Sequence, residues 1–298
     1  MTEPTLNYVH CPDALDGHRM AFWQWGNPSS KHVVLCVHGL TRQGRDFDTL
    51  AHGLCERSNG TVRVICPDVV GRGQSDWLKD PEAYQLPTYA ADMLALLAQL
   101  QPTTLDWVGT SMGGLIGMVV CGTANLPLPV PVRRLVLNDV GPALEWTALQ
   151  RIGEYLGRTG RFKSVQQAAD LMWTVSSSFG PHTSAEWLAL SQYMVKPLPD
   201  GSGDLTLHYD PAIAQPFSQM TEESVPASEA QLWQLYDQIQ ANTLLVRGAE
   251  SDLLSRQTAL AMGQRGPKAR LIEFVGVGHA PTFVADDQVA ALASFLLE

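Results

Sequence analysis

Short apolar runs recur along the chain, and each of them ends at a turn or at a polar residue. Runs that are apolar throughout, with no alternation of polar side chains, are typical of strands buried on both faces, as in a parallel sheet. This feature predicts a largely parallel sheet at the centre of the fold. The clearest runs are Val33–Val37, Val62–Cys66, Leu105–Val108, Leu135–Leu137, Leu244–Val246 and Leu271–Val275.

The segments between these runs have the apolar spacing of helices. Tyr89–Leu100 places its methionine and leucines on one broad face, and Val289–Leu296 repeats apolar residues at helical intervals. Because strands and helices alternate, we predict an α/β fold with helices on both faces of the sheet. Ahead of the first parallel strand, Leu6–His10 and Met20–Trp25 predict an antiparallel hairpin at the edge of the sheet.

The alternation is interrupted between Leu137 and Leu244, where the sequence is mostly helical in spacing. Lys196–Asp204, rich in Pro and Gly, predicts a loop within this stretch. We therefore expect a helical cap at residues 142–228, inserted into a core made of residues 1–141 and 229–298. The predicted helices of the interruption are Leu144–Leu156, Val165–Val175, Ala185–Met194 and Ala230–Ile239.

Composition limits the partners and the compartment. The formal charge of −10 repels phosphate backbones and anionic membranes, so we expect neither nucleic acid nor a membrane as a partner. Five cysteines, an odd number without a C-x-x-C pair, indicate free thiols in a reducing compartment. Met1–Pro4 offers no basic or apolar leader, and no apolar stretch has the ~20 residues of a membrane span. We expect a cytoplasmic protein, and its oligomeric state is left open.

The strongest local motif is Gly109–Gly114, with the sequence GTSMGG, between an apolar strand and an apolar helix. A sharp turn from strand to helix requires small residues two positions before and after its central serine, because larger side chains collide with neighbouring backbone. Such a turn exposes Ser111 Oγ at the N-terminus of the helix, where N–H groups favour developing negative charge. Ser111 is therefore the predicted nucleophile.

A base must remove the serine proton, and His279 is the best candidate. It lies in the turn after the last core strand, between Gly278 and Ala280, and Pro281 suits the start of a final helix. The acid that orients the histidine is expected between the two in the chain, at the end of a strand. Asp252 is preferred, Asp139 is the alternative, and Glu250 is a more remote candidate.

The loop after Val33–Val37 carries the second predicted element of the site. Gly39 lets the backbone bend so that the N–H of Leu40 joins that of Met112 as an oxyanion hole. His38 is expected to be structural. Arg42 either binds a carboxylate of the substrate or pairs with a neighbouring acid such as Asp46.

Taken together, these motifs resemble the α/β-hydrolase superfamily over nearly the whole chain. The matching segments are His38–Leu40, Pro67–Ser75, the serine turn, Asp252 and His279. The resemblance implies an eight-stranded, mostly parallel sheet with a cap inserted after the sixth strand, and it makes Pro67–Ser75 a mainly structural turn whose Arg72 braces loops near the site. The Asp nucleophile of haloalkane dehalogenases and epoxide hydrolases is missing, as is the His-Gly-Gly-Gly loop of hormone-sensitive-lipase-like esterases.

The chemistry implied is two-step hydrolysis of a small-molecule carboxylic ester or lactone through an acyl-enzyme, with no metal or other cofactor. A C–C bond hydrolase acting on a ring-cleavage product is the nearest enzymatic alternative, and a non-catalytic small-molecule receptor is the alternative from another class. Aromatic residues of the cap either line the substrate pocket or form the cap's own core. The main candidates are Trp146, Trp173 and Trp187, and Phe179, Tyr193 and Met194 accompany them.

Overall fold

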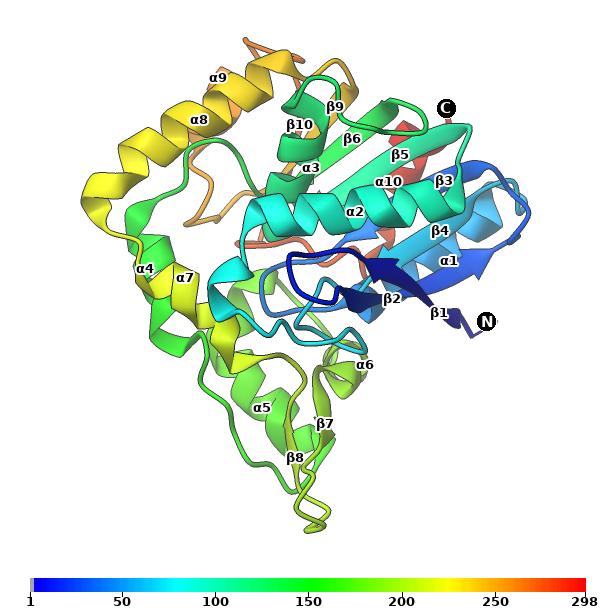
Figure 1. Ribbon diagram of the computed structural model, residues 1–298. Coiled ribbons are helices and arrows are strands. Elements are labelled where there is room, and N and C mark those ends of the chain that lie inside the picture. Colours follow the sequence, from blue (N-terminus) through cyan, green and yellow to red (C-terminus); the bar gives the residue numbers. More distant parts are fainter. Residues whose placement is uncertain (1–2) are drawn as a thin grey trace.

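The computed structural model describes residues 3–298. Met1 and Thr2 lie outside the described residues. They are the first half of Met1–Pro4, the segment predicted to offer no leader. An eight-stranded sheet with the strand order β1-β2-β4-β3-β5-β6-β9-β10 runs through the centre of the molecule (Figure 1). Its strands are β1 (Thr5–Cys11), β2 (His18–Gly26), β3 (His32–Val37), β4 (Arg63–Pro67), β5 (Thr104–Thr110), β6 (Val132–Asn138), β9 (Asn242–Gly248) and β10 (Arg270–Phe274).

The sheet is mostly parallel, as predicted. Only β2 is antiparallel to its neighbours β1 and β4, and the predicted edge hairpin is the β1–β2 pair. The middle strands are buried along most of their length, which explains their lack of polar alternation. The predicted fold class is confirmed.

Helices cover both faces of the sheet (Figure 1). One apolar cluster fills the space between the sheet and α2, α3, α8 and α9, and a second fills the space between the sheet and α1 and α10. The bounds of these helices are α1 (Asp48–Arg57), α2 (Leu86–Leu100), α3 (Met112–Gly122), α8 (Val225–Gln238), α9 (Arg256–Met262) and α10 (Asp286–Leu297).

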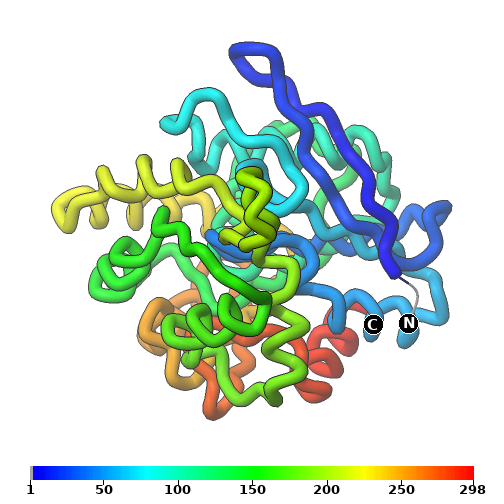
Figure 2. Tube along the Cα trace, turned by 90° about the horizontal axis from the view of Figure 1, so that it is seen from below, coloured from blue at the N-terminus to red at the C-terminus, as the bar shows by residue number. Residues whose placement is uncertain are grey.

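The segment between β6 and α8 forms a cap beyond one end of the sheet, and Figure 2 views the molecule from the cap side. The helix α8, which follows the cap, packs directly on α3. The two helices are so close that a Cβ on Gly122 would collide with the backbone of Leu235. This helix therefore belongs to the layers of the core, and the division at residues 142 and 228 stays a prediction. The cap elements are α4 (Trp146–Tyr155), α5 (Val165–Ser176), α6 (Ser184–Ser191), α7 (Ala214–Ser218), β7 (Val195–Pro197) and β8 (Leu205–Leu207).

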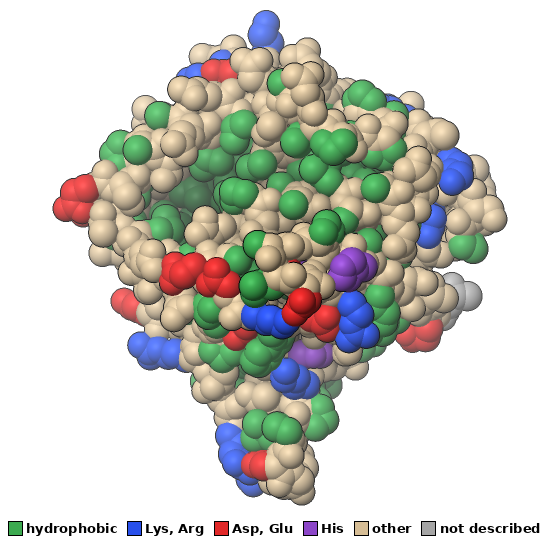
Figure 3. All heavy atoms as spheres, in the orientation of Figure 1, with side chains coloured by type: hydrophobic (Ala, Val, Ile, Leu, Met, Phe, Trp, Pro, Cys, Tyr) green, Lys and Arg blue, Asp and Glu red, His purple; other side chains and the backbone are tan. Residues whose placement is uncertain are grey.

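The loop predicted at Lys196–Asp204 joins the two short strands β7 and β8. Acidic and basic side chains lie together at the tip of this hairpin (Figure 3). Arg161 pairs there with Asp200 and Asp204, and Lys163 also pairs with Asp204. Opposite charges therefore balance at the tip.

Two sequence predictions about composition can be compared with the described residues. All five cysteines are free thiols. Within residues 3–298 no helix combines the length and apolarity that a membrane crossing would require.

Candidate active site

The turn between β5 and α3 holds Ser111 in a conformation that side chains rarely adopt. Its φ of 51° and ψ of −116° lie in the left-handed half of backbone space, and such strain costs of order 1–3 kcal/mol. The flanking glycines make the turn possible. A Cβ on Gly109 would collide with the carbonyl of Gly113, and a Cβ on Gly113 would collide with the carbonyl of Val37. The turn therefore requires the predicted glycine spacing.

The imidazole of His279 lies between a serine and a carboxylate. Its Nε2 is 3.0 Å from Ser111 Oγ, and its Nδ1 is 2.8 Å from Asp139 Oδ2. These partners assign a tautomer in which Nδ1–H donates to the carboxylate and Nε2 accepts from the serine hydroxyl. The side chain of His279 is largely shielded from solvent, with 13% of its surface exposed, so water competes little for either bond.

The preference for Asp252 as the orienting acid is wrong. Asp139 contacts His279, is fully buried, and begins the turn after β6 with a φ of 54°. Its Oδ1 accepts a bond from Gly248 N–H at 2.9 Å, and its Oδ2 accepts one from Ser251 Oγ at 2.6 Å. Three donors converge on one carboxylate, a set of bonds that an ionised acid can accept in full.

Asp252 lies elsewhere, on the surface between the core and the cap. Its Oδ2 accepts bonds from Nε and Nη2 of Arg151 at 3.1 and 2.6 Å, and half of its side chain is exposed. The loop after β9 therefore contributes donors to the acid through Gly248 and Ser251, while the acid itself comes from the preceding strand. Glu250, the remote candidate, is exposed and accepts a bond from Gly276 N–H at 3.0 Å.

Sheet register explains why Asp139 reaches the site. Thr110 is paired with Asn138 across β5 and β6, so the residues that follow them, Ser111 and Asp139, emerge side by side. The Ser111 N–H also donates to the carbonyl of Asn138 at 3.0 Å. The sequence did contain a signal for this acid. Asp139 closely follows the apolar run Leu135–Leu137, which is the next predicted strand in the chain after the one that ends at the serine turn.

The loop after β3 approaches the serine as predicted. A Cβ on Gly39 would lie 3.7 Å from Ser111 Cβ, and the Leu40 carbonyl accepts a bond from Arg72 Nε at 2.8 Å. Within residues 3–298 the Leu40 N–H has no hydrogen-bond partner, and Met112 is the first residue of α3, whose N–H has no acceptor inside the helix. Two donors are thus available near Ser111.

Arg72 and His38 hold this loop. Arg72 is fully buried and also donates to the Val70 carbonyl at 2.7 Å and to Tyr89 Oη at 3.1 Å. His38 accepts a bond from Val69 N–H at 2.9 Å on Nε2 and lies 2.7 Å from the Gly39 carbonyl on Nδ1. Burial lowers the pKa of His38 to about 3, so this histidine is neutral and acts as a structural residue.

A cavity of about 310 Å³ opens beside Ser111 and His279, between the core and the cap. Its volume lies at the lower end of the range for small-molecule sites. Its walls are mainly apolar, and Tyr155 and Tyr209 also line it. The apolar side chains of the lining include Ile152, Leu171, Met172, Val175, Phe179, Met194 and Leu207.

Arg42 lines the cavity, but its Nε and Nη2 lie 2.6 and 2.7 Å from the carboxylate of Asp46, and Nη2 also donates to the Leu190 carbonyl. It therefore pairs with the neighbouring acid and connects the core to α6. Of the aromatic and methionine candidates, Phe179 and Met194 line the cavity.

The three tryptophans predicted for the pocket pack elsewhere, which corrects that prediction. Trp187 is buried inside the cap, with its ring centroid 5.0 Å from that of Trp173, and its Nε1 donates to the Ala169 carbonyl at 2.8 Å. Trp146 packs against the apolar cluster around α4. Tyr193 Oη accepts a bond from Arg45. Sequence spacing identified an aromatic cluster in the cap but could not say which side faces the cavity.

Sequence analysis also missed a contact between the cap and the histidine loop. Ser178 Oγ donates to the His279 carbonyl at 3.1 Å, and the Gly278 N–H donates to the Ser178 carbonyl at 2.6 Å. Ser178 belongs to a short helical turn, Ser177–Phe179, directly after α5. The cap therefore helps to position the loop that carries His279, and no local sequence signal indicates such a long-range contact.

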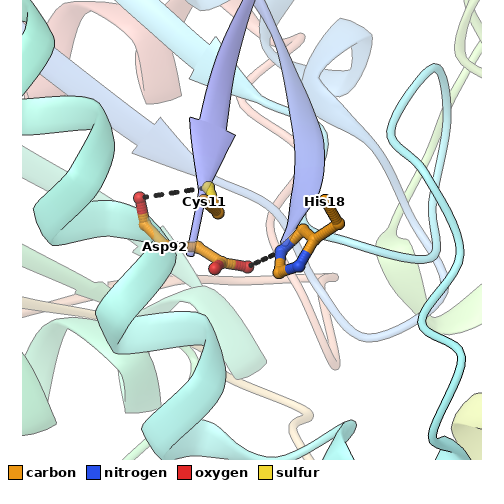
Figure 4. Close-up of side chains that lie close together, drawn as sticks. All are labelled: Cys11, His18 and Asp92. Atoms are coloured by element: carbon orange, nitrogen blue, oxygen red, sulfur yellow. Dashed lines mark hydrogen bonds and ion pairs between the residues drawn. The ribbon is translucent and has the colours of Figure 1, made fainter. Parts of the chain in front are cut away.

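One other cluster has side chains of the type that bind metals. The ligand atoms of Cys11, His18 and Asp92 lie within 4.8 Å of one another, buried between β1, β2 and α2 (Figure 4). His18 Nε2 is 3.0 Å from Asp92 Oδ2, and His18 Nδ1 is 3.3 Å from Asp13 Oδ2. Burial raises the pKa of the Cys11 thiol well above its usual range, so a neutral thiol faces the carboxylate. The hydrogen bonds between these groups fit a structural link from the edge hairpin to α2.

The sequence matches the model of the alpha/beta hydrolase family over residues 34–292, so the chain belongs to that family. The eight-stranded, mostly parallel sheet with helices on both faces is the fold of this family.

Three individual proteins are similar to this chain over most of its length. A 3-hydroxybutyrate-oligomer hydrolase of Cupriavidus necator is 48% identical, over 98% of this chain and 97% of its own length. An esterase of Mycobacterium tuberculosis is 28% identical over 90% of this chain and 82% of its own. Among solved structures, an alpha/beta hydrolase from Novosphingobium aromaticivorans is 35% identical with a TM-score of 0.82, covering 100% of this chain and 99% of that one.

Proposed function

We propose that the protein hydrolyses the ester bonds of 3-hydroxybutyrate oligomers through an acyl-enzyme on Ser111. The observation that carries the reaction type is the imidazole of His279, which lies within hydrogen-bond distance of both Ser111 and Asp139. The likeness to the Cupriavidus hydrolase over nearly the full length of both chains supports the substrate class. The cavity volume and its mixture of apolar and polar walls suit a short aliphatic ester.

In this mechanism Ser111 Oγ attacks the ester carbonyl while His279 Nε2 accepts its proton. Asp139 holds Nδ1–H and stabilises the imidazolium that forms. The N–H groups of Leu40 and Met112 stabilise the negative charge on the carbonyl oxygen, and one such donor is typically worth ~3 kcal/mol. The C–O bond of the ester then breaks while His279 protonates the departing alkoxide oxygen, and water activated by the same imidazole releases the acid from the serine.

The test is hydrolysis of the 3-hydroxybutyrate dimer and trimer, with monomer release followed by chromatography, beside a series of p-nitrophenyl esters. We expect turnover by the wild type and a loss on the order of 10⁴-fold or more in Ser111→Ala. Ser294→Ala is the matched control, because Ser294 is an exposed serine on α10.

Three other results would each replace the proposal. Labelling of Ser111 by a fluorophosphonate without turnover of any ester would favour the C–C bond hydrolase. Stabilisation by a small ligand that is never consumed would favour the receptor. Turnover of p-nitrophenyl esters alone would keep the esterase and exclude the oligomer as its substrate.

A further inference from the structure

The cavity beside Ser111 carries positive charge on its walls in a chain that is acidic overall. Three arginines line it, Arg42, Arg151 and Arg158, and among residues 3–298 no Asp or Glu does. The chain has 30 acidic and only 20 basic side chains, so this lining runs against the composition. Such a local excess of positive charge favours an anionic ligand.

Two of the three arginines already have a carboxylate partner just outside the cavity. Arg42 forms a two-bond pair with Asp46, and Arg151 donates two bonds to Asp252. Arg158 differs, since its guanidinium forms no ion pair or hydrogen bond with any side chain in the described part of the chain. The net charge of one on the cavity wall therefore comes from Arg158.

The backbone beneath Arg158 is fixed, although its side chain is exposed. Its N–H donates to the Tyr155 carbonyl at 3.1 Å, and its carbonyl accepts a bond from Tyr209 Oη at 3.2 Å. Gly157, directly before it, has a φ of +78°, and a Cβ there would lie 2.8 Å from that of Ala214. This glycine allows the sharp turn by which the chain leaves α4.

The same contacts connect Arg158 to the predicted oxyanion loop. Tyr209 forms an isolated β-bridge with Arg72, and Arg72 in turn donates to the Leu40 carbonyl. Tyr209 also lines the cavity. Buried Arg72 therefore connects two parts of one cavity. It contacts the loop beside Ser111 directly, and it reaches Arg158 through Tyr209.

We propose that Arg158 binds the free carboxylate of the substrate and makes the enzyme selective for aliphatic esters that end in an acid group. This proposal rests on the proposed ester hydrolysis. In a dimer of a hydroxy acid, the free carboxylate lies on the alcohol side of the ester, so Arg158 would hold the leaving group while Ser111 receives the acyl group. A guanidinium binds a carboxylate through two parallel hydrogen bonds, and its charge does not depend on pH in the physiological range.

The test compares the 3-hydroxybutyrate dimer as the free acid with its methyl ester, which adds one methyl group and removes the charge. Cleavage of the ester bond between the two hydroxybutyrate units is followed in both compounds. We expect the wild type to favour the free acid in kcat/KM. In Arg158→Gln the ratio of the two kcat/KM values should fall about tenfold, mainly through KM, because a charged hydrogen bond to an exposed group is lost. Arg158→Lys should restore part of the ratio, because it keeps the charge without the planar pair of donors.

Arg161→Gln is the matched control. Arg161 is a cap arginine three residues further along, outside the cavity lining, and Asp204 keeps Lys163 as a partner when Arg161 is replaced. It removes the same unit of charge, so an unchanged ratio in this variant shows that position matters and net charge does not.

Two results would overturn the proposal. One is a ratio that Arg158→Gln leaves unchanged, and the other is a wild type that does not discriminate between acid and methyl ester. In both cases continued turnover leaves the proposed ester hydrolysis intact. If the wild type hydrolyses neither compound, calorimetric binding of the free acid decides separately. Binding about tenfold weaker in Arg158→Gln would support the carboxylate site, and equal or absent binding would overturn it.

Discussion

The two walls of the cavity differ in how firmly their polar groups are held. Behind the core wall, Asp139 and Arg72 are fully buried, and each makes several hydrogen bonds that hold the turns and loops around Ser111. On the cap wall, the side chain of Arg151 is 39% exposed, and its partner Asp252, just outside the cavity, is 50% exposed. The apolar side chains of Leu171 and Val175 on this wall also face solvent.

Under the proposed function, the core wall carries out the reaction and the cap wall binds the substrate. A buried network in which every group has a partner holds its members in one arrangement, as transition-state stabilisation requires. Exposed pairs contribute little free energy and rearrange easily, which suits a wall that meets different lengths of an ester. The comparison therefore predicts large effects for changes in the core wall and small ones for changes in the cap wall.

The largest expected effect is that of Asp139→Asn. Asn has one acceptor oxygen and a donating NH2 group where Asp139 meets three donors with two oxygens, and it carries no charge. It therefore holds the Nδ1–H tautomer of His279 poorly and does not stabilise the imidazolium, so kcat should fall on the order of 10⁴-fold. The measurement is steady-state hydrolysis of a p-nitrophenyl ester, with circular dichroism as the check on folding.

Asp252→Asn is the matched control for this change, an identical substitution in the loop after β9, the neighbouring strand in the sheet. It should alter kcat less than about threefold, because its carboxylate contacts Arg151 on the surface. A larger loss in Asp252→Asn than in Asp139→Asn would reverse the assignment of the acid.

Asp139 and Asp252 also show which part of the site the sequence could not predict. Both follow an apolar strand, and both lie between Ser111 and His279 in the chain, so order alone does not separate them. The decision depends on sheet register, which pairs Thr110 with Asn138 and is a tertiary property. The serine turn and the histidine loop were predictable because their constraints are local, namely small residues at fixed offsets.

The cap was less predictable for a related reason. Its helices were indicated by spacing, but a helix that contacts core, cap and cavity has apolar residues on more than one side. Trp187 and Phe179 are both apolar and aromatic, yet one lies in the cap core and the other lines the cavity. Arg158, which has no side-chain partner within residues 3–298, belongs to no sequence motif.

The next effect in size is that of Arg72→Met, which tests whether the core wall depends on its buried cation. Removing the guanidinium leaves the carbonyls of Leu40 and Val70 without their donor, so the free energy of unfolding should fall by about 3 kcal/mol. The released loop should also lower kcat about tenfold, measured at a temperature where the variant is folded.

Arg63→Met is the matched control, since Arg63 is half-buried on β4 and its guanidinium donates to the Gln24 side chain. Stability is measured by urea unfolding of both variants. A kcat unchanged in Arg72→Met would mean that Leu40 keeps its position without this arginine.

A smaller, pH-dependent effect is expected from Asp68, which lies under the loop after β3. Burial raises the pKa of its carboxyl from an ordinary 3.8 to about 6, although N–H groups of Gln74, Gly44 and Trp23 lower it in part. Because the folded-state pKa lies above the unfolded one, its contribution to stability is fully present below about pH 3.8 and is lost as pH rises through about 6.

The measurement is the free energy of unfolding of the wild type minus that of Asp68→Asn, taken across pH. Between about pH 4.5 and 7.5 this difference should fall by about 2 kcal/mol, from the linkage of the two pKa values. Costs of the amide that do not depend on pH cancel from the slope. A difference that rises with pH would show that the three N–H donors outweigh burial and keep this carboxylate ionised.

The smallest effect is expected at the cap wall, for the pair Arg151 and Asp252. A double-mutant cycle with Arg151→Gln and Asp252→Asn, followed by urea unfolding, should give a coupling below about 1 kcal/mol, because both side chains are well exposed. The coupling should shrink further at high salt, where exposed charges are screened. A coupling above about 2 kcal/mol that survives high salt would mean that the cap wall is held as firmly as the core wall. In that case Arg151 would be as fixed as Arg42 is by Asp46, and the selectivity of the cavity would have to come from a rigid cap instead of an adjustable one.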